Sequence, residues 1–195
     1  KSQSTEDIII NLRDEVCRTM ESATKIYDRT LIAVFKENRK VLRDMVKESN
    51  DLFYQSRERK YTLLPTLKKL QSSDVNTAHY YVQVVDYLNE MTKALMHISA
   101  GVEHIDNNHE GLSKEQAKDL MSINDDVESI YRHINQMLRD GFPEIEMVLT
   151  LRDQLFESIA EAIKSELSRI KRSPLEYQGQ LLYLTILTET KNMVA

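Results

Sequence analysis

Apolar residues recur every three or four positions along the middle of the chain. From Tyr81 the spacing is 3, 4, 3, 4, 3, 4 and 3, through Val84, Leu88, Met91, Leu95, Ile98, Val102 and Ile105. This period is typical of a helix whose apolar seam packs against other helices at a shallow angle. The pattern therefore predicts an all-α protein, built as a helical bundle.

Further stripes of the same period, separated by turn residues, predict six long helices. We expect them over residues 5–36, 38–70, 74–109 and 114–140, then to about 172, and from 173 onward. Pro65 falls inside the second helix and is expected to kink or break it near Tyr61–Leu64. The boundary between the first two helices is the least defined, because residues 35–40 contain no glycine or proline.

The fourth helix has the clearest start signal. Ser113-Lys114-Glu115-Gln116 reads as a capping box, with Ser113 as the N-cap and Gln116 at the third helical position. Ser173-Pro174 marks the start of the last helix, because proline is well tolerated in a first turn.

The six helices look like two copies of three. At an offset of 99 residues the third helix overlays the sixth, so that Leu88 falls on Leu187 and Glu90 on Glu189. The first helix overlays the fourth in the same way. The sequence thus predicts two tandem antiparallel three-helix bundles, over residues 1–110 and 111–195.

Composition narrows the possible functions. Only 4 Gly and 3 Pro in 195 residues leave little material for an all-β or α/β fold. A net charge of −5 argues against nucleic acid as a partner. The single cysteine, Cys17, cannot form an internal disulfide, and its place on a helical stripe favours a core residue over a reactive thiol.

Three segments resemble the PhoU family, and more closely the PhoU-like domain at the C-terminal end of bacterial sodium/phosphate cotransporters. They are residues 35–42, 80–88 and 182–192. The resemblance implies two tandem three-helix units, each carrying an acidic pair four residues apart on its third helix, where the pair can hold a metal cluster. Aligned on Leu88 and Leu187, these positions fall on Asn89, Lys93, Thr188 and Asn192.

None of the four aligned positions carries a carboxylate, so we expect no metal cluster. The chain has no G-x-S-x-G motif, no glycine-rich phosphate loop and no HExxH motif, so we expect no catalytic residue, and we expect no cofactor. Glu90 and Glu189, one position further on, are read either as displaced ligands or, preferably, as exposed helical glutamates. Asp106, His109 and Glu110 could share a face and bind zinc, and His97 and His104 also share a face. A solvated, charged helix end explains the same residues and is preferred.

Basic residues gather near the ends of the second and fifth helices. They are Arg57, Arg59, Lys60, Lys68, Lys69, Arg169, Lys171 and Arg172. Cations near a helix C-terminus complement its dipole, which is the simpler interpretation. The functional alternative is that these ends face an anionic leaflet or an anionic regulator. The acidic group Asp125, Asp126 and Glu128 has no histidine or cysteine partner and is read as an exposed helix face.

The resemblance implies a cytoplasmic regulatory domain of a sodium-dependent phosphate symporter, on the cytoplasmic side of the inner membrane. Its partners would be the membrane portion of the same chain, regulatory proteins or a second copy of itself, and it would not be an enzyme. One alternative is a free-standing PhoU-type regulator of phosphate signalling. The other is a helical scaffold or sensor with no link to phosphate.

Overall fold

The computed structural model describes residues 5–67, 75–103, 113–140, 145–172 and 177–194, and over this part of the chain it is all-helical. Its helices are α1 (Thr5–Phe35), α2 (Arg39–Leu67), α3 (Val75–Glu103), α4 (Lys114–Asp140), α5 (Ile145–Arg172) and α6 (Tyr177–Val194). The predicted all-α helical bundle is confirmed, and the predicted bounds of α4 match. The expected extension of α3 to residue 109 lies outside the described residues.

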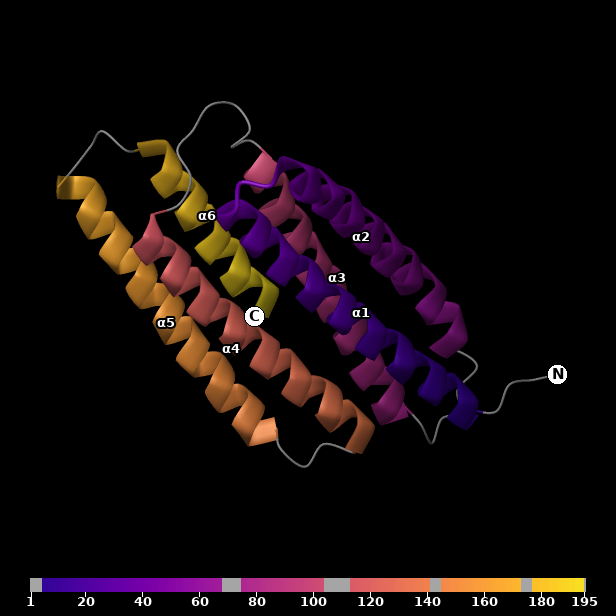
Figure 1. Ribbon diagram of the computed structural model, residues 1–195. Coiled ribbons are helices and arrows are strands. Elements are labelled where there is room, and N and C mark those ends of the chain that lie inside the picture. Colours follow the sequence, from indigo (N-terminus) through magenta and orange to yellow (C-terminus); the bar gives the residue numbers. More distant parts are fainter. Residues whose placement is uncertain (1–4, 68–74, 104–112, 141–144, 173–176, 195) are drawn as a thin grey trace.

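The helices form an elongated bundle with α2 and α5 at its two edges (Figure 1). The other four helices, α1, α3, α4 and α6, lie between them. On one side α2 packs against α1 and α3, and on the other side α5 packs against α4 and α6. The two sides are joined where α1 contacts α4 and where α3 contacts α6. Helices α2 and α5 consequently occupy opposite edges of the molecule.

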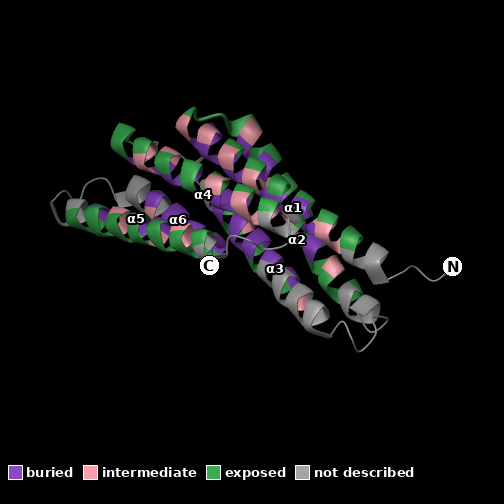
Figure 2. Ribbon diagram, turned by 90° about the horizontal axis from the view of Figure 1, so that it is seen from below, coloured by how far each residue is buried: buried purple, intermediate pink, exposed green. Residues whose placement is uncertain are grey.

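A single apolar core runs through the whole bundle, and the outer faces of the helices carry the exposed residues (Figure 2). It includes Tyr27 and Leu31 of α1, Leu95 of α3, Tyr131 of α4 and Ile186 of α6. Cys17 is a free, buried member of this core, as expected from its stripe. Because both halves of the chain share the core, their division into two separate bundles stays a prediction.

Buried polar contacts fix α6 within the core. The hydroxyl of Thr190 donates to the carbonyl of Ile186, so the Tyr27 hydroxyl donates to Thr190 Oγ1 at 2.8 Å. The hydroxyl of Tyr131 donates to the carbonyl oxygen of Met193 at 3.0 Å. Helices α1 and α4 are thus both tied to α6 by buried hydrogen bonds.

The turn between α1 and α2 is a Schellman motif built without glycine. The amide of Asn38 bonds to Ala33 O at 2.9 Å, and the amide of Glu37 bonds to Val34 O at 3.2 Å. Glu37 adopts the left-handed conformation that this motif requires, with φ of 52°. Asn38 then caps α2, its side-chain oxygen accepting from the amide of Val41 at 3.2 Å.

The predicted capping box at the start of α4 is confirmed. The amide of Ser113 donates to Gln116 Oε1 at 3.0 Å, and the amide of Gln116 donates to Ser113 Oγ at 3.2 Å. The same glutamine also reaches α5, where its Nε2 donates to Glu166 Oε1 at 2.7 Å. Both side chains are buried, so this contact fixes the start of α4 against α5.

Of the kink or break predicted near Pro65, the break is wrong, because α2 continues through that residue to Leu67. Proline removes one backbone donor and crowds the carbonyl four residues earlier. In the last turn of a helix that cost falls on a single hydrogen bond, so the helix need not end before it. Across the described residues, none of the helices is long and apolar enough to cross a membrane.

Candidate functional site: a polar groove between α3 and α6

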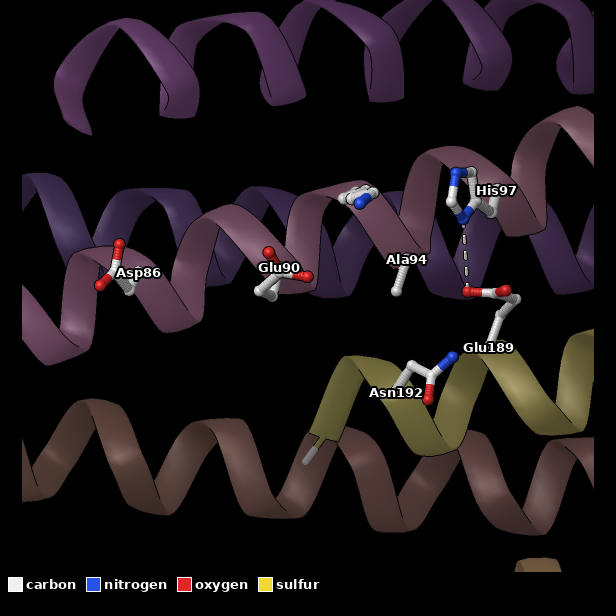
Figure 3. Close-up of a pocket in the computed structure, with 7 residues that line it drawn as sticks. Asp86, Glu90, Ala94, His97, Glu189 and Asn192 are labelled. Atoms are coloured by element: carbon white, nitrogen blue, oxygen red, sulfur yellow. Dashed lines mark ion pairs between the residues drawn. The ribbon is translucent and has the colours of Figure 1, made fainter. Parts of the chain in front are cut away.

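An open groove of about 520 Å³ runs along the line where α3 and α6 lie side by side. Figure 3 shows Asp86, Glu90, Ala94 and His97 of α3 on one wall and Glu189 and Asn192 of α6 on the other. Lys93 also lines the groove. The walls therefore carry three carboxylates, one lysine, one histidine and one amide.

The groove exists because the same heptad pattern that builds the core leaves a polar face beside it. Leu88, Met91, Leu95 and Ile98 of α3 are buried in the bundle. Asp86, Glu90, Lys93 and His97 follow the spacing 4, 3, 4 and so share another face of the helix. On α6, burial of Ile186, Leu187 and Thr190 leaves Glu189 and Asn192 at the rim.

Two ion pairs hold charged residues of the groove. Lys60 Nζ of α2 lies 2.9 Å from Asp86 Oδ1, and His97 Nδ1 lies 3.6 Å from Glu189 Oε2. The hydrogen bond from Lys60 to Asp86 and the charge of that carboxylate raise the pKa of Lys60, with a further contribution from Glu90. The pairs tie α3 to a helix on each side, α2 at Asp86 and α6 at His97.

Between the ion pairs, the groove presents charges that the described part of the protein does not pair. Glu90 and Lys93 are both exposed, and neither takes part in an ion pair with another described residue. Asn192 of α6 is exposed on the opposite wall. This arrangement can donate and accept hydrogen bonds toward a bound polar segment.

Four of the residues compared between the two repeats line this groove. Lys93 and Asn192 line the groove together, as do Glu90 and Glu189. Asn89 is half-buried beside it, and its Oδ1 is buried without a hydrogen-bond partner. Thr188 is exposed and does not line the groove. Glu90 is thus an exposed helical glutamate as preferred, whereas Glu189 is half-buried and pairs with His97.

Across the described residues, no group of three or more histidine, cysteine, aspartate or glutamate side chains is placed to hold a metal ion. The zinc candidates Asp106, His109 and Glu110 lie outside the described residues, as does His104. The expectation that the chain has no metal site stays a prediction.

The basic residues predicted to gather at the end of α2 point toward different partners and form no single cluster among the described residues. Arg59 turns to α1, where it lies 3.8 Å from Glu15 and donates to Thr19. Lys60 turns to Asp86 of α3, and Arg57 lies over the ring of Tyr61. Lys68 and Lys69 lie outside the described residues, as do the side chains of Arg169, Lys171 and Arg172.

The acidic group on α4 is exposed, as predicted. Partial burial and the neighbouring charge of Asp125 raise the pKa of Asp126. The adjacent Asn124 is buried and donates to Asp28 of α1 at 2.7 Å. The hydrogen bond of Asn124 thus contributes to the contact between α1 and α4 beside the exposed acidic group.

Sequence reasoning missed Asp86 and its contact with Lys60. The signal was present, because Asp86 stands four residues before Glu90 and eleven before His97 on the polar face of the same helix. The groove as a whole is suited to recognition, with mixed charge on two rigid helices.

No protein-family model matches this chain, and no curated protein shows significant similarity to it.

Proposed function

We propose that this chain is a PhoU-like regulatory domain of a sodium-dependent phosphate symporter, acting on phosphate uptake through protein contacts at the α3/α6 groove. The observation that carries the proposal is that Glu90 and Glu189, and likewise Lys93 and Asn192, line the same groove. These are the positions that the repeat comparison made equivalent, and they line one groove.

The charges of the groove favour recognition over metal chemistry. Lys93 places a cation where a metal-binding PhoU protein would carry a carboxylate, and a cation there repels a metal ion. Glu90 stands one position after Asn89, and its side chain is exposed. A partner segment carrying both a basic and an acidic side chain would match this pair.

The position of the groove suggests how docking would be transmitted. The contact between α3 and α6 is one of the two seams that join the halves of the bundle. The His97–Glu189 ion pair crosses that seam. A partner that takes over either residue changes the interactions between the halves, which is a physical route from docking to regulation.

The test measures uptake of labelled phosphate in cells that express the full-length parent protein. Three variants are compared with it: a deletion of residues 1–195, the double variant Glu90→Lys and Lys93→Glu, and the control Lys118→Glu on α4. Lys118 is exposed and outside the groove. We expect the deletion and the double variant to change the response of uptake to external phosphate, while basal transport persists and the control behaves as the parent.

Unchanged regulation in the double variant would refute the role of the groove. Loss of folding of the membrane part on deletion would count against a regulatory domain. A chain that acts without a membrane portion, on a histidine kinase or a phosphate ABC transporter, would support the free-standing regulator. No effect on any phosphate response would favour the unrelated scaffold.

A further inference from the structure

The two edge helices carry nearly all of the exposed large apolar side chains in the described residues. Tyr54 and Tyr61 lie on α2, while Met147, Leu149 and Leu167 lie on α5. Ile10 of α1 is the remaining one in the described part. Helices α2 and α5 also lie at the two edges of the bundle (Figure 1). Exposed apolar side chains on such faces often mark an interaction surface.

The outer face of α2 carries a stripe of cations and tyrosines with the spacing of a helix seam. At intervals of 3, 4, 3, 4, 3 and 4 it runs through Lys40, Arg43, Lys47, Asn50, Tyr54, Arg57 and Tyr61. Tyr54 is 59% exposed and Tyr61 is 66% exposed. This period matches a second helix lying along α2 at a shallow angle. Arg and Tyr are also enriched at the centres of protein interfaces.

The outer face of α5 carries the opposite charge. Asp153, Glu157 and Glu161 are exposed and four residues apart, so they share one side of the helix. The buried residues Leu155 and Ile159 place the opposite side of α5 against the bundle. Met147 is 46% exposed and lies in the first turn of the same helix. We call Lys40, Arg43 and Lys47 the basic stripe, and Asp153, Glu157 and Glu161 the acidic stripe.

We propose that the chain associates with a second copy of itself, the basic stripe of α2 docking on the acidic stripe of α5 in the next molecule. An antiparallel register sets Lys40 against Glu161, Arg43 against Glu157 and Lys47 against Asp153. The same register sets Tyr54 against Met147, a favourable sulfur–aromatic pairing. The inference stands on the outer helices and does not depend on the proposed function.

Other occupants fit the stripe less well. Two parallel α2 helices would set each cation against its own copy, and an antiparallel pair centred on Asn50 would set Arg43 against Arg57. A flat anionic membrane would meet the whole outer side of α2, including the exposed Asp44, Asp51 and Glu58 beside the stripe. These carboxylates offset much of the attraction of the cations for acidic lipids. A partner helix contacts only the narrow stripe and avoids that repulsion.

The positions of the two stripes determine the form of the assembly. Helices α2 and α5 lie at opposite edges of the molecule (Figure 1). A contact between two different surfaces is heterologous. A docked pair therefore still has an unused acidic stripe on one molecule and an unused basic stripe on the other. Association then continues into an open chain or closes into a ring.

The experiment is sedimentation velocity of the purified chain at concentrations up to about 500 µM, a range that detects weak association. We expect the mean mass to rise with concentration in about 50 mM NaCl. It should fall to that of the monomer in about 500 mM NaCl, where the Debye length is only about 4 Å. Insensitivity of an associated state to salt would contradict charge pairing.

Charge reversal then tests the two stripes separately. One variant carries Lys40→Glu, Arg43→Glu and Lys47→Glu, which sets acids against the acidic stripe. We expect association to weaken about 100-fold or more, because like charges at an interface cost several kcal/mol. The matched control carries Arg29→Glu, Lys118→Glu and Lys191→Glu. It makes the same change in net charge at exposed positions outside both stripes, and it should associate as the parent does.

The complementary variant carries Asp153→Lys, Glu157→Lys and Glu161→Lys, and it should also be monomeric. An equimolar mixture of the two triple variants should associate again, because every α2–α5 contact between one variant and the other pairs opposite charges. A chain carrying all six substitutions should recover association on its own. A parent chain that is monomeric at every concentration in low salt, or a mixture that fails to associate, would overturn the proposal. Binding of the parent but not the basic-stripe variant to phosphatidylserine vesicles, without self-association, would identify a membrane as the occupant instead.

Discussion

The buried contact between Gln116 and Glu166 offers the sharpest test of how the bundle is held together. Gln116 uses its oxygen to cap α4 and its amide nitrogen to reach Glu166, and the two buried side chains are 2.7 Å apart. Replacement of Gln116 by glutamate keeps the capping acceptor but exchanges the donor for a second carboxylate. The substitution Gln116→Glu therefore changes only the contact with α5.

The expected cost follows from the burial of Glu166, whose exposed fraction is 1%. A hydrogen bond to a charged group contributes about 1.5 to 3 kcal/mol to stability. Repulsion between two carboxylates in a site closed to water adds to that loss. We expect Gln116→Glu to lower the free energy of unfolding by about 3 to 5 kcal/mol, a large part of the roughly 5 to 15 kcal/mol typical of a domain.

The assay is urea unfolding followed by far-UV circular dichroism, for Gln116→Glu, Glu166→Gln and the double variant. The double variant reverses donor and acceptor, since Gln at 166 can donate to Glu at 116, so most of the lost stability should return. A cost under about 1 kcal/mol, or a double variant no more stable than Gln116→Glu alone, would refute the reasoning.

Three further predictions concern single sites. Glu37→Gly should raise the free energy of unfolding by about 0.5 to 1 kcal/mol in urea unfolding, because glycine adopts φ of 52° without steric cost; a loss of stability would contradict this. Burial raises the pKa of Tyr27 above its ordinary value, so the fold should lose stability as pH rises through about 10, where the unfolded tyrosine ionises. Tyr27→Phe should cost about 1 kcal/mol at pH 7 and flatten that alkaline loss, which unfolding curves at pH 7 and at alkaline pH would check. Burial and the charge of Asp125 raise the pKa of Asp126, so Asp126→Asn should stabilise the protein slightly at pH 7 and not below about pH 3, as thermal unfolding at the two pH values would show.

Features determined by neighbouring residues could be predicted from the sequence. The bounds of α4 follow from a capping box, an amphipathic stripe and the sequence signal Gly141-Phe142-Pro143 after Asp140, all of which are local. The burial of Met20, Leu31 and Leu95 follows from their places on apolar stripes. The helical class of the fold was therefore accessible without any knowledge of tertiary contacts.

Features that join distant parts of the chain could not be predicted. The hydrogen bond between Tyr27 and Thr190 spans 163 positions, and nothing near either residue indicates the other. The turn at Glu37 lies where the first two helices were predicted to meet, but its left-handed conformation had no signal in the sequence, because the residue is not glycine. The groove could be predicted only in part. Its α3 wall was visible as a polar stripe, but its α6 wall depended on which helices pack together.

The burial of α6 within a core shared by both halves has a consequence for synthesis. Tyr183, Ile186, Leu187 and Met193 of α6 complete the same core to which Tyr27 belongs. Helices α1 and α3 are translated long before α6, and the part of the apolar surface of α3 that packs against α6 stays uncovered in the meantime. At a translation rate of about 5 to 20 residues per second, roughly 10 to 40 s separate the start of the chain from residue 194. During that interval the nascent chain depends on chaperones or on transient contacts to avoid aggregation, and folding to the native core can finish only after α6 has left the ribosome.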